Sequence, residues 1–350
     1  MISLADRASS PLLSGGVERL ELSRRGEVLA QLSGADEPRW VQLLEQGERE
    51  LDPLQDDQLP LAKDLGRLRA VQRARLLAWR PGRRMVVLVQ SVDAPGGKAV
   101  LKGLRAGRFR AALERQLEGS RAGRAAGLSV PEVIATDPGH AAFMLSWMGE
   151  ATVPLAVGSA RLFSRLGAAL ARFQRAEGGA ELELHGVDDE LTVLEELSAR
   201  SARLRGALPR DWAQARDRVA SHLRSIPPGP AVRTHRDLHD GQLLDVAGDV
   251  ALLDFDLLCR ADEALDPSNL LAHLELRQLQ GLADSAGALD CAQAFRVGYG
   301  REGEAELAQR MRAWQAVSLL RLALVYHLRP PYAHLSQALV ERALTHLLEA

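Results

Sequence analysis

The sequence has little of what marks secreted, metal-thiolate or membrane proteins. Only two cysteines occur, Cys259 and Cys291, and neither lies in a CxxC or Cys/His ligand spacing. No stretch approaches the ~18 consecutive apolar residues of a membrane span. The first residues, MISLADRASS, lack the apolar run of a signal peptide. We therefore expect a cytoplasmic protein with reduced thiols and no membrane partner.

A strong excess of charge of one sign is also absent. The formal net charge is −2, and the arginines, which far outnumber the lysines, are scattered among acidic residues. This balance predicts no nucleic-acid partner. With 350 residues, of which 46% are hydrophobic, the chain is long enough for one large domain or two ordinary ones. Its oligomeric state is not indicated.

Residues 1–66 form an N-terminal extension whose structure the sequence leaves open. The segments VERLEL and EVLAQL are compatible with a short hairpin, and PRWVQLLEQGEREL is compatible with a helix. The stretch DPLQDDQLP, with two prolines, indicates a connector.

Residues 67–149 predict a small antiparallel sheet with one helix. VQRARLLAW, MVVLVQSV and KAVLKGL are strand-like, and so are EVIAT and AAFMLSW further on. A helix is expected over 108–126, because Phe109, Leu113 and Leu117 recur every four residues and would form its core face.

Residues 150–350 are dominated by long helical patterns. A loop and two short strand-like pieces, QLLDV and VALLDF, interrupt them near 232–256. The chain therefore predicts an α+β protein of two lobes, a sheet-rich lobe at 67–149 and a larger helical lobe at 150–350. A cleft between lobes is a common place for a ligand.

The most informative segment is RTHRDLHDGQLL at 233–244, followed by LLDFD at 252–256. Phosphoryl transfer needs a carboxylate to orient and deprotonate the acceptor hydroxyl, oxygen ligands for Mg²⁺, and a cation on the nucleotide phosphates. Asp237 in the loop, Asp254 after an apolar run, and Lys102 on a predicted strand occur in the order that such an enzyme requires.

With these residues the sequence resembles the aminoglycoside phosphotransferase and choline kinase-like family, which shares the two-lobed protein kinase fold. The loop of that family usually reads H-G-D-x-H-x-x-N and precedes a D-F/W-D/E metal segment. The resemblance spans about 79–348 and is most specific over 233–275, where DPSNLLAHL also matches the helix after the metal segment. An HRD-type loop ending in glutamine is typical of one branch.

The resemblance implies roles for individual residues of the loop and metal segment. Asp237 would be the catalytic aspartate, Asp254 the main Mg²⁺ ligand, and Gln242 would replace the asparagine that is the second metal ligand. His235 and Asp256 would support the loop. His239 is interpreted as structural, and the longer side chain of Gln242 leaves the second metal contact open.

The resemblance also implies a nucleotide site for ATP or GTP. Lys102 would contact the phosphates and pair with Glu118 of the predicted helix, with Glu114 as the alternative one turn earlier. Ser146 and Met148 would belong to the hinge that offers backbone groups to the purine. No glycine-rich loop precedes Lys102; WRPGRR at 79–84 stands there instead, and either presents Arg83 or Arg84 to phosphate or is an ordinary basic turn.

The sequence therefore predicts a Mg²⁺-dependent O-phosphotransferase that acts on a hydroxyl of a sugar, amino alcohol or antibiotic-like molecule. One alternative is a catalytically weak nucleotide-binding pseudokinase that serves as an interaction module. Another is a metal hydrolase built on the histidines and aspartates of 235–240, which lacks a second ligand cluster. The acidic stretch 181–196 would attract a cationic acceptor, or is a solvated helix start.

Overall fold

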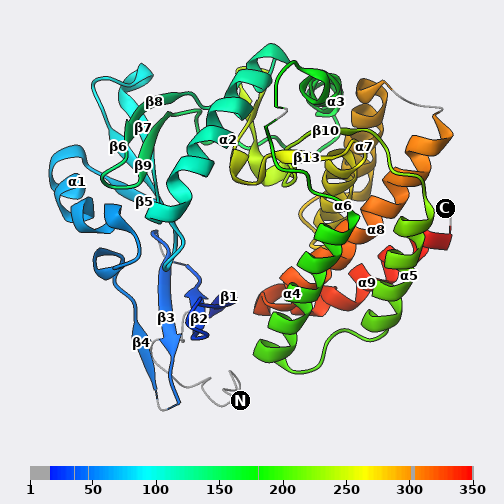
Figure 1. The fold of residues 1–350 in the computed structure, drawn as a ribbon, viewed down its shortest axis with the longest axis horizontal. Helices are drawn as coiled ribbons and strands as arrows, with labels where there is room; N and C mark the ends of the chain where they lie inside the picture. The colour runs from blue at the N-terminus through cyan, green and yellow to red at the C-terminus, as the bar shows by residue number, and fades with distance from the viewer. Residues whose placement is uncertain (1–15, 35, 46, 180, 301–303, 349–350) are drawn as a thin grey trace.

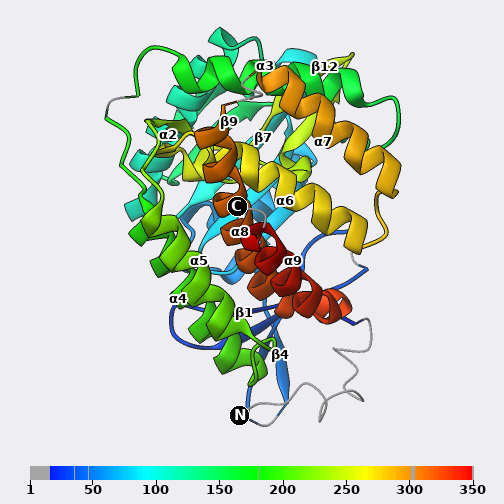
Figure 2. The ribbon, with the colours of Figure 1, turned by 90° about the vertical axis from the view of Figure 1, so that its right-hand side faces the viewer.

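A computed structural model describes residues 16–34, 36–45, 47–179, 181–300 and 304–348. Strands and short helices of the first half lie on one side in Figure 1, and the long helices of the second half lie on the other. Figure 2 views the helical side, with α6, α7, α8 and α9 toward the reader.

The N-terminal extension contains a four-stranded antiparallel sheet in the order β1-β2-β3-β4, formed by β1 (Val17–Leu22), β2 (Val28–Leu32), β3 (Arg39–Leu43) and β4 (Glu48–Glu50). The first two strands confirm the hairpin interpretation. The helix interpretation of the following segment is wrong. Trp40 packs in one hydrophobic cluster and Val41 and Leu43 in another, so both faces of β3 are buried. A strand buried on both faces reads as an apolar run, which periodicity does not separate from a helix.

A five-stranded antiparallel sheet follows, in the order β5-β6-β7-β9-β8. Its strands are β5 (Arg75–Arg80), β6 (Arg84–Gln90), β7 (Lys98–Leu104), β8 (Val133–Asp137) and β9 (Ala142–Ser146). The short helix α1 (Leu65–Gln72) and three 3₁₀ turns, η2 (Pro53–Gln55), η3 (Pro60–Asp64) and η4 (Pro95–Gly97), complete this part. Trp40 donates its indole N–H to the carbonyl of Trp79 at 2.8 Å, which ties the two sheets together.

Helix α2 (Ala106–Ala125) connects β7 to β8, close to the predicted bounds. Its predicted core face is only partly right, because Phe109 and Leu113 are half-buried while Leu117 is exposed. The buried face consists of small or uncharged residues instead, among them Gln116 and Gly119. A Cβ atom on Gly119 would overlap the ring of Phe255. Glycine therefore lets α2 approach the segment that contains Asp254.

The helical part is built from α3 (Ala160–Arg175), α4 (Val187–Arg205), α5 (Trp212–Ser225), α6 (Leu265–Leu279), α7 (Ser285–Tyr299), α8 (Ala305–His327) and α9 (Ser336–Leu348), with the 3₁₀ turn η7 (Pro330–Leu335). Its buried apolar side chains form the largest hydrophobic cluster of the described chain. Both cysteines are buried and free. Within the described residues, no helix has the length and apolar character needed to cross a membrane.

Two short antiparallel strand pairs interrupt the helices and position the loop singled out in the sequence. β10 (Ala231–Thr234) pairs with β13 (Cys259–Asp262), and β11 (Leu243–Val246) pairs with β12 (Asp249–Leu252). The 3₁₀ turns η5 (Asp240–Gln242) and η6 (Phe255–Leu257) lie between them. The loop after β10 and the segment after β12 therefore emerge next to each other.

Candidate active site

His235 ties the loop after β10 to the segment after β12. Its side chain is fully buried, and Nε2 lies 2.7 Å from the carbonyl oxygen of Leu253 while Nδ1 lies 3.3 Å from the amide N of Asp237. An amide can only donate, so Nδ1 accepts and Nε2 carries the proton toward Leu253. His235 thus fixes the backbone of Asp237 relative to the residue before Asp254, which fits a supporting role.

Asp266, at the start of α6, holds the same loop from behind. Its two carboxylate oxygens accept hydrogen bonds from the amides of His235 and Arg236, each at 2.7 Å. Burial raises the pKa of Asp266 to about 6, although the neighbouring His235 and the two amides act in the opposite direction. The sequence reasoning did not single out Asp266; its position at the start of the DPSNLLAHL match was the available signal.

Two cationic side chains of the five-stranded sheet form ion pairs with Asp254 and Asp256. Lys102 Nζ, on β7, lies 2.9 Å from Asp254 Oδ1 and 2.5 Å from Asp256 Oδ1. Arg84 Nη1, on β6, lies 3.0 Å from Asp254 Oδ2 and 2.9 Å from Asp256 Oδ2. Four charges therefore form one network across the cleft, and Arg84 is not an ordinary turn residue.

The network favours the charged forms of Asp254 and Lys102. Burial alone would raise the pKa of Asp254, but Lys102 and Arg84 outweigh it and hold that pKa well below its usual range. Burial likewise opposes the charge on Lys102, yet Asp254 and Asp256 raise the pKa of its amine. Asp254 also has φ +61°, a left-handed conformation that costs a non-glycine residue about 1–2 kcal/mol. The fold maintains this strain at the point where the carboxylate turns into the cleft.

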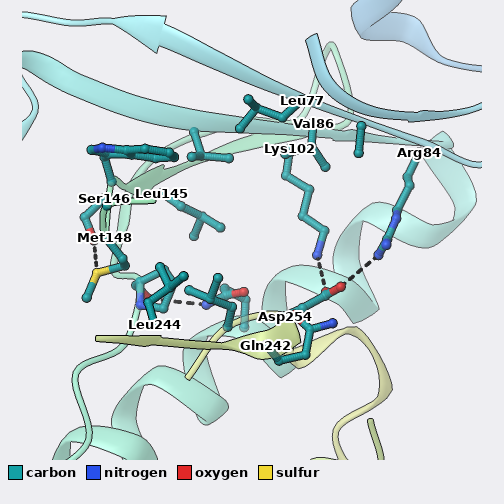
Figure 3. A pocket seen from close by; sticks show the side chains of 17 residues that line it. Leu77, Arg84, Val86, Lys102, Leu145, Ser146, Met148, Gln242, Leu244 and Asp254 are labelled. Atoms are coloured by element: carbon teal, nitrogen blue, oxygen red, sulfur yellow. Dashed lines mark hydrogen bonds and ion pairs between the residues drawn. The ribbon is translucent and has the colours of Figure 1, made fainter. Parts of the chain in front are cut away.

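A cavity of about 290 Å³ opens between the sheet and the β11–β12 hairpin. Figure 3 shows Leu77 and Val86 on one wall and Leu244 on the other, with Lys102 and Arg84 converging on Asp254 at one end. The apolar walls can enclose a flat ring system, and the charged end can hold anionic oxygens.

Gln242 and the predicted hinge residues line the same cavity. Gln242 lies beside Asp254 in Figure 3, and Ser146 and Met148 lie at the opposite end. The Ser146 hydroxyl accepts a hydrogen bond from the amide of Glu132 at 2.9 Å, which holds this end of the cavity against β8. The structure thus brings Lys102, Gln242, Asp254, Ser146 and Met148 to one cavity.

The predicted ion pair between Lys102 and Glu118 is wrong. Glu118 instead accepts from Arg233 Nη2 at 2.5 Å and from Arg121 Nη2 at 2.9 Å. The alternative, Glu114, pairs with Arg110 at 2.9 Å on the exposed side of α2. Gln116 is the α2 residue that lines the cavity, and its amide donates to Ser120 and to the carbonyl of Pro131. No carboxylate stands on this face of the helix, so Asp254 and Asp256 are the counter-charges of Lys102.

Asp237 lines a second cavity, which shares Arg84 and Asp254 with the first. Its side chain is 36% exposed, and Oδ2 lies 3.9 Å from His239 Nε2. Burial lowers the pKa of His239, against the effect of Asp237 and Asp240, so that imidazole is neutral near pH 7. The carboxylate of Asp237 is therefore accessible from the cleft without a strong partner.

The metal-hydrolase alternative requires clustered metal ligands. One group of potential ligands, His239, Asp240 and His273, has its ligand atoms within 4.8 Å of one another. Asp240 is already paired with Arg277 at 2.9 Å, and the rings of His239 and His273 stack at 4.5 Å. His235 and Asp237 are not members of this group. The part of the chain that the structure describes holds no second group of this kind, so a dinuclear hydrolase site is not supported.

Comparison with known proteins gives one family match. The model of the family described as "Phosphotransferase enzyme family" matches residues 83–314, which contain Arg84, Lys102, Asp237, Gln242 and Asp254. A search of curated proteins found no match.

Solved structures of similar fold include several kinases. A choline/ethanolamine kinase family protein from Mesorhizobium loti is 16% identical, with a TM-score of 0.55, over 83% of this chain and 100% of that one. The amicoumacin kinase hAmiN, in complex with AMP-PNP, Ca²⁺ and Ami, is 16% identical, with a TM-score of 0.58, over 80% and 92%. The aminoglycoside phosphotransferase APH(3'')-Id from Streptomyces rimosus is 18% identical, with a TM-score of 0.54, over 76% and 98%. These likenesses confirm the predicted two-lobed, kinase-like α+β fold.

Proposed function

The chain belongs to the phosphotransferase enzyme family, as its loop motif predicted, and on that premise we propose that it transfers the γ-phosphoryl group of ATP or GTP to a hydroxyl of a small molecule. The observation that carries the proposal is the junction of the two cavities. Lys102, Arg84 and Asp254 meet there at 2.9–3.0 Å, and Asp237 lines the second cavity together with Arg84 and Asp254.

The donor nucleotide would occupy the cavity of about 290 Å³. Its base would lie between Val86 and Leu244, with its edge toward the backbone of 146–148, and its phosphates would reach Lys102 and Arg84. The apolar walls and the two cations at one end match the two chemically different halves of a nucleotide. We accordingly propose 67–149 as the nucleotide-binding lobe and 150–350 as the lobe of the catalytic loop and acceptor.

Magnesium would be held by Asp254 and Gln242. The donor set fits this ion, because it consists of a carboxylate kept ionised by its neighbours and a neutral amide oxygen in the same cavity, with Asp256 close by. When bound, Mg²⁺ neutralises charge on the phosphate oxygens. Lys102 and Arg84 now bind Asp254 and Asp256, so phosphate oxygens would compete with these carboxylates for the two cations.

Asp237 would orient the acceptor hydroxyl and accept its proton. The bond between the γ-phosphorus and the β–γ bridging oxygen breaks, a bond from the acceptor oxygen to that phosphorus forms, and the nucleoside diphosphate leaves. His235 and Asp266 are positioning residues, since their hydrogen bonds fix the backbone amides of Asp237 and of the two residues before it.

The acceptor class that we propose follows from the substrates for which proteins of similar fold are named. The structures named above are described as choline/ethanolamine, amicoumacin and aminoglycoside kinases or phosphotransferases. A hydroxyl-bearing sugar, amino alcohol or antibiotic-like molecule is therefore the acceptor that we propose at this level.

The test replaces Asp237 with asparagine, which keeps the shape of the side chain and removes its basicity. A general base contributes about 10²–10⁴-fold, so turnover should fall about 10³-fold. Nucleotide affinity should stay within about twofold of wild type, because Asp237 does not line the nucleotide cavity. Nucleotide consumption and calorimetric nucleotide binding are measured on the same preparation. Near-normal turnover in Asp237→Asn would remove Asp237 from this role. A wild-type protein that binds nucleotide but never consumes it would favour the pseudokinase alternative.

A further inference from the structure

The second cavity differs from the nucleotide cavity in its walls. Its volume is about 580 Å³, and it contains Asp237, so the proposed function assigns it to the acceptor. Seven of the residues that line it are arginines. Walls of this kind concentrate positive potential and attract anions.

The arginines come from three segments that are distant in the sequence. One segment is the turn between β1 and β2, another is the β5–β6 hairpin, and the third is the N-terminal half of α2 with the residue that precedes it. They contribute, respectively, Arg24; Arg80, Arg83 and Arg84; and Arg105, Arg108 and Arg115.

Four of these arginines have partners of their own. Arg84 pairs with Asp254 and Asp256, and Arg80 lies 3.7 Å from Glu21. Arg83 donates to a backbone carbonyl at 3.2 Å, and Arg115 pairs with a glutamate at 2.9 Å. Their guanidinium groups therefore already interact with acceptor groups of the protein.

Three arginines of the cavity are different. The guanidinium groups of Arg24, Arg105 and Arg108 make no hydrogen bond or ion pair with any residue that the structure describes, and the side chains of Arg24 and Arg108 are exposed to solvent. Nε of Arg105 is buried from solvent and has no partner. Burial, followed by the charges of Arg24 and Arg108, lowers the pKa of Arg105. Like charges held together without counter-ions cost free energy, which a bound anion would offset.

The carboxylates of the cavity do not neutralise these three arginines. Asp254 and Asp256 are bound by Arg84 and Lys102, and Asp237 faces the cleft as the proposed base. Glu196 is the remaining acidic group of the lining. The acceptor side of the cleft thus has an excess of positive charge.

Three acidic residues of the stretch 181–196 already have partners within the protein. Asp188 pairs with Arg224, Asp189 accepts from the amide of Gly186 at the start of α4, and Glu190 is buried against His185. Of the acidic residues in this stretch, all of them described, only Glu196 lines the cavity. The interpretation of the stretch as a helix start, rather than an amine-binding patch, is the one that the structure supports.

We propose that the acceptor is an anion: a small hydroxyl compound that also carries a phosphate or carboxylate group, held by Arg24, Arg105 and Arg108 while its hydroxyl faces Asp237. This rests on the proposed function and narrows its acceptor class. The planar guanidinium group matches the two oxygens of a carboxylate or phosphate, and such pairs are stronger than neutral hydrogen bonds. Sugar phosphates and hydroxy acids have this chemistry.

The experiment titrates anions into the full-length protein saturated with Mg²⁺ and a non-hydrolysable ATP analogue. Pyrophosphate and citrate are the probes, and calorimetry measures their dissociation constants. The variants are Arg105→Gln with Arg108→Gln, and the matched control is Arg110→Gln. Arg110 lies on the same helix, pairs with Glu114, is 91% exposed in its side chain, and lines neither cavity.

The nucleotide-saturated wild type and the control should bind at least one of the anions. The double variant should bind it at least tenfold more weakly, with nucleotide affinity changed less than about twofold. Glycerol 3-phosphate should displace the probe and glycerol should not, whereas a carboxylate source would show as preferential displacement by hydroxy acids.

Four results would overturn the inference. Three concern the anions: no anion bound by the wild type with or without nucleotide, equal anion affinity in the double variant, or anion binding by the nucleotide-free wild type that is lost when nucleotide is present. The last result would assign the arginines to the donor phosphates. A cationic aminoglycoside that binds more tightly than the anions would also contradict it. In each case the proposed function stands if the wild type both binds and consumes nucleotide, whereas absence of nucleotide binding removes both proposals.

Discussion

The two cavities that meet at Asp254 are lined by residues of opposite chemical character. The nucleotide cavity has apolar walls from Val86 and Leu244 and places its cations at one end, whereas the second cavity is surrounded by arginines. Apolar walls select a flat, neutral ring through burial, and arginine walls select charge. On the proposed function, this difference implies that donor and acceptor would be recognised by different physical effects, although Asp254 lines both cavities.

Three residues test this division because of where they lie. Asp254 lines both cavities, Lys102 lines only the nucleotide cavity, and Asp237 lines only the second. Replacing Asp254 should impair the use of both nucleotide and acceptor. Replacing Lys102 or Asp237 should impair the use of only one of them.

The largest effect is expected for Asp254→Ala. The change removes the carboxylate proposed for Mg²⁺ and leaves the buried Lys102 and Arg84 with Asp256 alone. Turnover should fall by about 10³-fold or more, comparable with the loss of a catalytic carboxylate, and added magnesium should not restore it. A magnesium titration of turnover measures this, with circular dichroism as the control for folding. An unchanged magnesium dependence would show that the metal is held elsewhere.

The next effect is expected for Lys102→Ala, which should separate the cavities. Lys102 is a point charge on the proposed phosphate site and lines the nucleotide cavity only. A charge-assisted contact contributes about 1.5–3 kcal/mol, so kcat/KM for nucleotide should fall about 10–100-fold. The KM for acceptor should change little. Steady-state kinetics with each substrate varied in turn decides the point, and a defect confined to the acceptor would contradict the placement.

A smaller, pH-dependent effect is expected from Asp266, which lines neither cavity and acts through the loop that precedes Asp237. Its pKa is raised to about 6 by burial, so above that pH it is ionised and both oxygens accept the loop amides. Below about pH 6 one oxygen is protonated and loses an accepting position, and kcat should therefore fall as the pH decreases through that value. Profiles of kcat between about pH 5 and 8 measure this.

Asp266→Asn is the matched control for the pH effect. An amide does not titrate, so the acidic limb near pH 6 should disappear from the residual activity, and kcat should be lower than wild type at pH 8. Persistence of the limb in this variant would assign it to another group.

The smallest effect is expected for Gln242, which lines the nucleotide cavity beside Asp254. If its amide oxygen is the second metal ligand, Gln242→Ala should raise the magnesium requirement about 10-fold, in the range found when groups that support a metal site are removed. Gln242→Asn should restore it only in part, because the side chain is one methylene shorter. Identical magnesium titrations for wild type and Gln242→Ala would eliminate the ligand role.

Most of the predicted site residues that the structure brings into the cleft region lie close together in the chain. His235, Asp237, Gln242 and Asp254 fall within 235–254, a stretch that consists of one loop and one short hairpin. Lys102 was recognisable because a lysine in a strand-like run precedes the helix and the loop in the expected order.

The pairing of Glu118 was wrong because it depends on the rotation of α2, which sequence separation does not determine. The sequence did carry a signal for that rotation. Gln116, Gly119, Ser120 and Gly123 are spaced as one small, uncharged helical face, and that face packs against Phe255 and Pro131. The leucine spacing suggested a different face, and Leu117 proved exposed.

By itself, the sequence determined the order of the chemical groups and the family, because the catalytic loop and the metal segment are local motifs of contiguous residues. Only the tertiary structure decided which charges meet. Lys102 reaches Asp254 and Asp256 across the cleft, more than a hundred residues away in the chain. Arg24 and Arg105 reach one cavity from two elements that no sequence spacing connects. Long-range electrostatic partners depend on how the sheets and α2 pack, and packing is a property of the whole chain.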